Sequence, residues 1–144
     1  MKGKWTVWLM VAMAGLALAG CNKKAESPIE TRHDVTDARA DAQRDVADAQ
    51  ADARENNADA QRDVAQAQAD HDPNDVADEA QEASQTAAKG EYKVAVAEAE
   101  ATHKVAMQKC EALSGSAQAD CKQHADDELD RAKKAAEARR DGAG

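Results

Sequence analysis

Beyond residue 20 this chain contains few large apolar side chains, and that scarcity limits what it can fold into. Residues 21–144 hold one isoleucine, seven valines, two leucines, one methionine and one tyrosine, while alanine is far more frequent. A globular domain of this length buries many more bulky side chains than that. The sequence therefore predicts an all-α protein without a globular core, stabilised by the helix propensity of alanine and by narrow seams between helices.

The first twenty residues have the pattern of a secretory signal peptide. Lys2 and Lys4 precede an uncharged, largely apolar stretch from Trp5 to Leu18. As a helix this stretch spans about 21 Å, which is too short for the ~30 Å hydrocarbon core of a bilayer. We expect residues 1–20 to be removed as a signal peptide.

The leader ends in Leu18-Ala19-Gly20-Cys21, which resembles the lipobox of bacterial lipoproteins. In that family the leader is cut between Gly20 and Cys21, and Cys21 is then lipidated on its thiol and acylated on its amino group. Because two or more acyl chains anchor a protein stably, the resemblance implies a periplasm-facing chain tethered in the cell envelope. Asn22 is not the aspartate that often retains such proteins in the inner membrane, which favours the outer membrane. The alternative is a chance cysteine after an ordinary or uncleaved signal.

A tether and a repeat follow the cysteine. Residues 21–32 are polar, contain Pro28 and lack periodicity, which predicts a flexible tether. Residues 33–72 are acidic, alanine-rich and repetitive: DAQRDVADAQAD at 41–52 recurs at 59–70 with eleven of twelve residues identical. The offset of eighteen residues equals five helical turns, so the repeat keeps its faces in register. It predicts one extended helix of about 57 Å over residues 33–70.

Two stripes run along this expected helix. Small residues recur at spacings of three, four or seven and predict a close but weak contact with another helix: Val35, Ala38, Ala42, Val46, Ala49, Ala53, Ala60, Val64 and Ala67. An acidic row lies one residue earlier: Asp34, Asp37, Asp41, Asp45, Asp48, Asp52, Glu55, Asp59 and Asp63. The mean spacing of 3.6 predicts only slight supercoiling. We interpret the acidic row as a solvated face; the alternative is weak binding of divalent cations or of a cationic partner.

Asp72 and Pro73 mark the next boundary, with Asp72 as the expected N-cap and Pro73 in the first turn of a new helix. We expect a short helix over residues 73–89 that ends at Lys89-Gly90, because a glycine after a basic last turn is typical of a helix C-terminus.

Residues 91–140 predict an αα-hairpin. Two heptad-like seams carry its apolar residues: Tyr92, Val96, Ala99, His103, Ala106, Cys110 and Leu113, then Cys121, Ala125, Leu129, Ala132 and Ala136. A turn through residues 113–116, with Ser116 as N-cap, separates the seams and sets Cys110 opposite Cys121, Ala106 opposite Ala125 and Ala99 opposite Ala132. In an oxidising periplasm Cys110 and Cys121 should form a disulfide. We expect residues 141–144 to be a disordered tail.

Residues 92–136, around CEALSGSAQADC at 110–121, resemble a family of small uncharacterised exported proteins of Gram-negative bacteria. This resemblance implies a helical hairpin and brings no known activity. The charged, alanine-rich repeat also resembles the murein lipoproteins in a broad way. However, the chain ends Asp141-Gly142-Ala143-Gly144 and lacks their terminal lysine, so attachment to peptidoglycan is not implied.

The sequence offers no catalytic residues, cofactor or metal site. A zinc site from His103, Cys110, Cys121 and His124 is disfavoured because His103 and Cys110 stand about 10.5 Å apart along one helix. Small-molecule sites are usually lined by aromatic side chains, and the processed chain has only one tyrosine, so no small-molecule substrate is expected. The net charge of −9, which becomes −11 once Lys2 and Lys4 leave with the leader, argues against nucleic acid and anionic membrane surfaces as partners.

These features predict a non-enzymatic, lipid-anchored envelope protein that acts as a structural spacer or helix–helix interaction module, with itself or with an envelope protein. One alternative is a periplasmic adaptor that binds and regulates a specific protein through the C-terminal hairpin. A second is a hydrophilic stress-protectant chain that resembles late-embryogenesis-abundant proteins.

Overall fold

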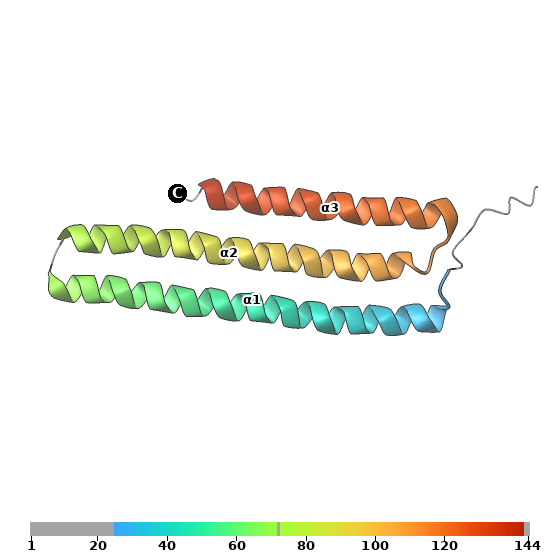
Figure 1. Ribbon diagram of the computed structural model, residues 1–144, viewed down its shortest axis with the longest axis horizontal. Helices are drawn as coiled ribbons and strands as arrows, with labels where there is room; N and C mark the ends of the chain where they lie inside the picture. The colour runs from blue at the N-terminus through green and yellow to red at the C-terminus, as the bar shows by residue number, and fades with distance from the viewer. Residues whose placement is uncertain (1–24, 72, 143–144) are drawn as a thin grey trace, which may run out of the picture.

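The described part of the chain, residues 25–71 and 73–142 of the computed structural model, consists of three long helices and contains no strand. Helix α1 spans Pro28–Asp70, α2 spans Pro73–Cys110 and α3 spans Gly115–Gly142 (Figure 1). The predicted all-α class, with a long low-complexity helix followed by a disulfide-linked hairpin, is confirmed.

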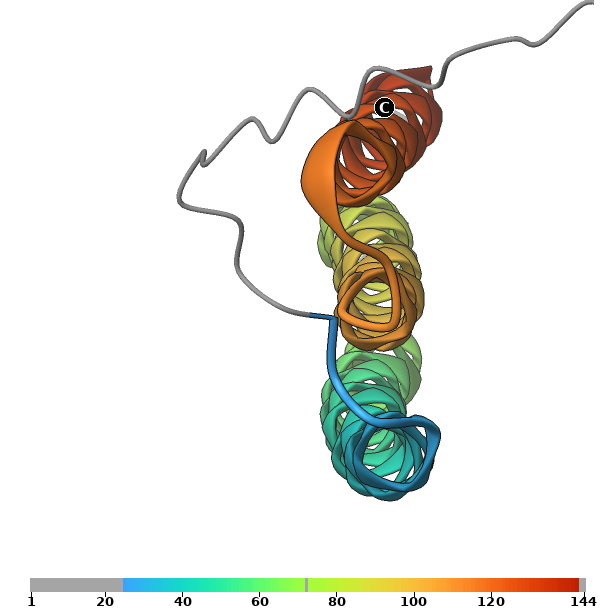
Figure 2. The same cartoon turned by 90° about the vertical axis from the view of Figure 1, so that its right-hand side faces the viewer.

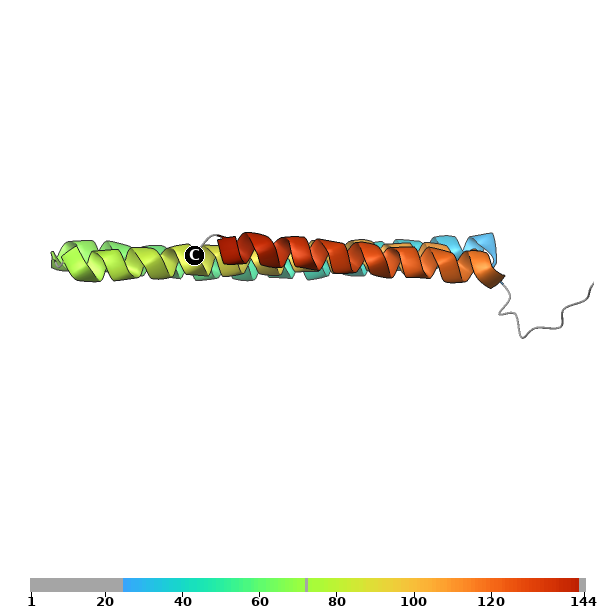
Figure 3. The same cartoon turned by 90° about the horizontal axis from the view of Figure 1, so that it is seen from above.

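The three helices lie side by side in a single layer with α2 in the middle (Figure 2). Successive helices run antiparallel, and within the described ranges α1 and α3 each contact α2 but not each other. Helix α3 is shorter and covers only the half of α2 that leads to Cys110 (Figures 1 and 3). The sequence predicts the repeat helix and the hairpin one after the other, whereas the structure folds α1 back along α2.

Helix α1 begins inside the segment predicted to be a tether. Ser27 is its N-cap, with the Ser27 hydroxyl accepting a hydrogen bond from the Glu30 amide (3.3 Å). Pro28 follows at the first helical position, where its missing N–H costs nothing and its fixed φ suits the helix. The tether prediction for residues 21–32 is therefore wrong from Pro28 onward, because this proline starts a helix instead of interrupting one.

The small-residue stripe predicted along α1 is the surface that meets α2. Every member of the stripe is buried or half-buried, and Thr31 and Asn57 extend it. The ten positions from Thr31 to Val64 repeat as steps of four, three and four, an eleven-residue period of 3.67 residues per turn, and Ala67 follows three residues later. That period is so close to the natural 3.6 that the helices stay nearly straight (Figure 3). Asn57 occupies the place that Val35 and Val46 hold in earlier repeats, and its amide oxygen is enclosed without a hydrogen-bond partner.

The boundary between α1 and α2 lies where the proline predicted it. His71 ends α1 in the left-handed conformation (φ 59°), and its amide donates to the Gln68 carbonyl oxygen (3.4 Å). Helix α2 begins at Pro73, as expected. Asp72, the predicted N-cap, lies outside the described residues.

The predicted end of a short helix at Lys89-Gly90 is wrong, since α2 continues through Gly90 to Cys110. Gly90 is buried against α1, and a Cβ placed on it would stand 3.1 Å from the Cβ of Ala53. It also lacks the positive φ of a C-terminal glycine, which among the described glycines only Gly115 adopts. This glycine therefore serves the close approach of two helices.

Helix α2 carries a second seam that was not among the predicted ones. Its α1-facing stripe repeats at helical spacing and is buried or half-buried throughout: Val76, Ala83, Ala87, Gly90, Val94, Ala97, Ala101, Val105 and Gln108. The predicted α3-facing seam runs along the opposite side of the helix, from Tyr92 to Cys110. The buried residues of the described chain are small, chiefly alanines, so two thin seams take the place of a core.

We predict that Gly90→Leu lowers the free energy of unfolding by about 1–3 kcal/mol, because the new side chain forces α1 and α2 apart at Ala53. Urea denaturation followed by circular dichroism measures this change. Ala80→Leu, at an exposed position of the same helix, is the matched control and should shift stability by less than about 0.5 kcal/mol. Equal effects from the two substitutions would contradict the close-approach role.

Candidate interaction surface

The hairpin turn joins α2 to α3 through residues 111–114. The Leu113 amide donates to the Cys110 carbonyl oxygen (3.0 Å), and Gly115, with φ 64°, reverses the chain into α3. Helix α3 thus includes Ser116, which was predicted as its N-cap. Leu113 was expected to extend the apolar seam but lies exposed in the turn, since the chain has already left α2.

Cys110 and Cys121 form the predicted disulfide, with their Cα atoms 5.7 Å apart. Cys110 ends α2 and is completely buried, while Cys121 lies in the second turn of α3. The Gln118 side-chain amide donates to the Glu111 carboxylate (2.8 Å) and to the Cys110 carbonyl oxygen (3.4 Å). The turn is therefore fixed by a covalent bond and by hydrogen bonds.

Polar contacts fix the register of α3 on α2 along their shared length. His103 Nε2 lies 2.7 Å from a carboxylate oxygen of Asp126, and Lys133 Nζ lies 2.7 Å from Glu100. At the far end of α3 the Arg140 guanidinium lies over the Tyr92 ring, 4.6 Å from its centroid. The Glu100 carboxylate raises the pKa of Lys133 by accepting its hydrogen bond, although an exposed pair of this kind adds little stability.

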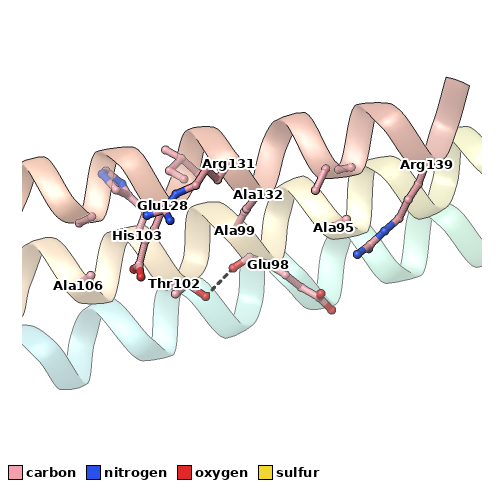
Figure 4. A pocket seen from close by; sticks show the side chains of 14 residues that line it. Ala95, Glu98, Ala99, Thr102, His103, Ala106, Glu128, Arg131, Ala132 and Arg139 are labelled. Atoms are coloured by element: carbon pink, nitrogen blue, oxygen red, sulfur yellow. Dashed lines mark hydrogen bonds between the residues drawn. The ribbon is translucent and has the colours of Figure 1, made fainter.

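A shallow groove of about 560 Å³ runs between α2 and α3. The alanine pairs predicted to face each other, Ala99 with Ala132 and Ala106 with Ala125, line it together. Figure 4 shows Ala99 and Ala132 between the two helices, with Arg139 reaching from α3 towards α2.

A second groove of about 620 Å³ runs between α1 and α2 and shares Thr102, Ala106 and Glu128 with the first. The two grooves therefore open on the same side of the helical layer. We call this side the alanine face, defined by the following residues of the three helices: Ala47, Ala95, Ala99, Ala106, Ala132 and Ala135. Its rim mixes amides with both signs of charge, among them Gln43, Glu98 and Arg131.

The acidic row of α1 lies on the other flank of the buried stripe. Lys104 of α2 reaches it, with its Nζ 3.4 Å from Asp41 and 3.8 Å from Asp45. Arg44 pairs with Asp41 (2.9 Å), and Arg62 pairs with Asp59. Asp34 and Asp37 lie beside His33, so the row is partly neutralised by its own helix and by α2, and its remaining members are exposed.

The histidines form local ion pairs or caps instead of a joint site. His33 lies 3.1 Å from Asp37, and His124 lies 3.2 Å from Glu128 on the next turn of α3. Among residues 25–71 and 73–142, no three His, Cys, Asp or Glu side chains are grouped as a metal site requires. Of the four residues weighed as zinc ligands, both cysteines are in the disulfide.

The predicted lipidation and cleavage residues, Cys21 and Gly20, lie outside the described residues, as does the whole leader. Within the described chain, none of the three helices is apolar enough over a sufficient length to cross a bilayer.

Comparison with known proteins finds no match for the chain among protein-family models, curated proteins or solved structures.

We predict that Cys110→Ala combined with Cys121→Ala lowers stability by about 3 kcal/mol, because the loop is then no longer closed in the unfolded chain. The loss should concentrate in α3, whose seam is thin. Hydrogen exchange by mass spectrometry should show α3 amides losing protection while α1 keeps its own. Dithiothreitol should reproduce the pattern in the wild-type chain and leave the double variant unchanged; full protection of α3 without the disulfide would contradict the prediction.

Proposed function

We propose that this protein is a lipid-anchored cell-envelope protein that acts without catalysis, as a structural spacer and helix–helix interaction module. The leader is cleaved between Gly20 and Cys21, and the acylated Cys21 is the anchor. The chain then faces the periplasm, with the outer membrane favoured over the inner membrane. This proposal draws on the lipobox-like sequence together with the shape and surface of the three-helix layer.

The shape supports a spacer. The 43 residues of α1 make it about 65 Å long, and α2 runs back beside it along most of that length. The chain enters at one end of the layer, where the Glu26 amide donates to the Glu111 carbonyl oxygen of the hairpin turn (3.0 Å). The turn between α1 and α2 lies at the opposite end (Figure 1). If the end that contains the α2–α3 turn is tethered to the membrane, the length of the helices therefore sets how far the α1–α2 turn stands from it.

The alanine face is the single observation that carries the interaction role. Side chains this small let another helix approach closely, but each contributes little buried area. Such a face suits contacts that are broad and individually weak, and the charges on its rim give them a preferred register.

The α2–α3 hairpin also favours the second candidate, a periplasmic adaptor. This hairpin is the part of the layer held by the disulfide, and it contributes both walls of one groove and five of the six residues that define the alanine face. The adaptor differs from the spacer in having one specific protein as its partner.

In-cell photo-crosslinking tests this proposal. A benzoylphenylalanine at Ala135, on the alanine face, should form adducts in the membrane fraction. The same residue at Glu137, an exposed position on the opposite flank of α3, is the matched control and should form few. Cys21→Ser should remove the chain from the membrane fraction and abolish the Ala135 adducts, because the tether no longer concentrates it there.

The identity of the adducts separates the two candidates. Adducts between copies of this chain support a self-associating spacer, and one recurring foreign protein supports the adaptor. Equal labelling from Ala135 and Glu137 would contradict an interaction role for the alanine face. A Cys21→Ser chain that stays in the membrane fraction would contradict the anchor.

A further inference from the structure

The described residues expose only two large apolar side chains. Ile29 is 81% exposed in the first turn of α1, and Leu113 is 39% exposed in the hairpin turn. The valines between residues 25 and 142, in contrast, all lie half-buried in the seams. Single exposed apolar side chains are common on protein surfaces, so the position of these two relative to each other decides whether they form a contact surface.

Both side chains lie at the same end of the layer. Ile29 is the second residue of α1, and the α2–α3 turn that holds Leu113 lies beside the start of α1 (Figures 1 and 2). The Glu26–Glu111 backbone hydrogen bond ties the two segments together. They are remote in sequence, so their meeting at one end is a property of the fold.

The same end carries cations that no carboxylate neutralises. Arg32, Arg39 and Lys109 line a hollow together with Glu26, Pro28 and Ala112, and the three cations make no ion pair within the described part of the chain. Guanidinium and ammonium groups beside apolar side chains match the layered chemistry of a lipid surface, where phosphates lie above acyl chains.

Carboxylates are also present at this end, and Glu26 lies in the same hollow as the three cations. Glu111 pairs with Lys122 of α3. One carboxylate oxygen of Glu26 is enclosed without a partner, and burial, together with Asp34, Glu111 and Glu30, raises the pKa of Glu26. The salt bridge to Lys122 thus offsets the charge of Glu111.

We propose that the end formed by Ile29 and Leu113 rests on a phospholipid bilayer, with both side chains in its interfacial region and the neighbouring cations at the phosphates. This inference rests on the proposed anchor. Ser27 lies six positions after Cys21, a stretch that spans at most about 21 Å, so an acylated Cys21 keeps this end close to the membrane. Contact through two side chains is weak alone and becomes effective because the tether makes it intramolecular. The layer then stands on the membrane with its α1–α2 turn pointing away.

Tryptophan fluorescence tests this contact. Trp5 and Trp8 both belong to the leader, so the processed chain has no tryptophan and a single introduced one reports alone. The acylated full chain is reconstituted into phosphatidylcholine vesicles with plain or brominated acyl chains. Ile29→Trp and Leu113→Trp should each show a blue shift and a loss of intensity in brominated vesicles. Gln66→Trp, exposed near the far end of α1, should show neither.

A second variant tests whether the native side chain contributes. Adding Ile29→Ser to Leu113→Trp should reduce quenching at position 113, because one of the two apolar contacts is gone. Unquenched tryptophans at 29 and 113, in a chain that mass spectrometry shows to be acylated on Cys21, would overturn the contact and leave the anchor standing. An unmodified Cys21 in a chain that does not bind vesicles would overturn the anchor, and the contact with it.

Discussion

The close approach of helices through small side chains is the contact on which the whole structure depends. Gly90 of α2 meets Ala53 of α1 with little room for a further methyl group, and alanine is the commonest residue at the other contact positions of this seam. Seams of this kind bring backbones near each other but bury little apolar area per residue. The long helices compensate by repeating the same contact over many turns.

The single-layer architecture follows from the number of contact seams on each helix. Only α2 has buried or half-buried stripes on two opposite sides, so it lies in the middle and α1 and α3 flank it. Without a third seam the layer does not close into a bundle, and its two broad sides stay open. One side presents the alanine face, and the other presents the acidic row of α1 with Lys104 and Lys133 bridging neighbouring helices. The two sides differ in chemistry although the same three helices build both.

Periodicity in the sequence predicted the local parts of this fold well. The stripe from Val35 to Ala67 is the α1–α2 contact, and the spacing around Cys110 and Cys121 fixed the hairpin and the disulfide. Pro28 and Gly90 were misinterpreted because each residue has two structural uses. A proline interrupts a helix or starts one, and a glycine ends a helix or admits a neighbouring backbone. At Gly90 the deciding fact is the position of Ala53, thirty-seven residues away in sequence, which local patterns do not contain. The alanine face escaped prediction for the same reason, since it combines residues of three helices.

Small-angle X-ray scattering of the unacylated chain, residues 22–144 with the disulfide intact, tests the folded-back arrangement most directly. A monomer with α1 packed along α2 should have a longest dimension near that of α1, about 65–75 Å, and the cross-section of several helices. A chain whose repeat helix extends beyond the hairpin should exceed about 100 Å, with the cross-section of a single helix over much of its length. We expect the shorter dimension, because the small-residue seam packs α1 along α2. The longer dimension would contradict that packing.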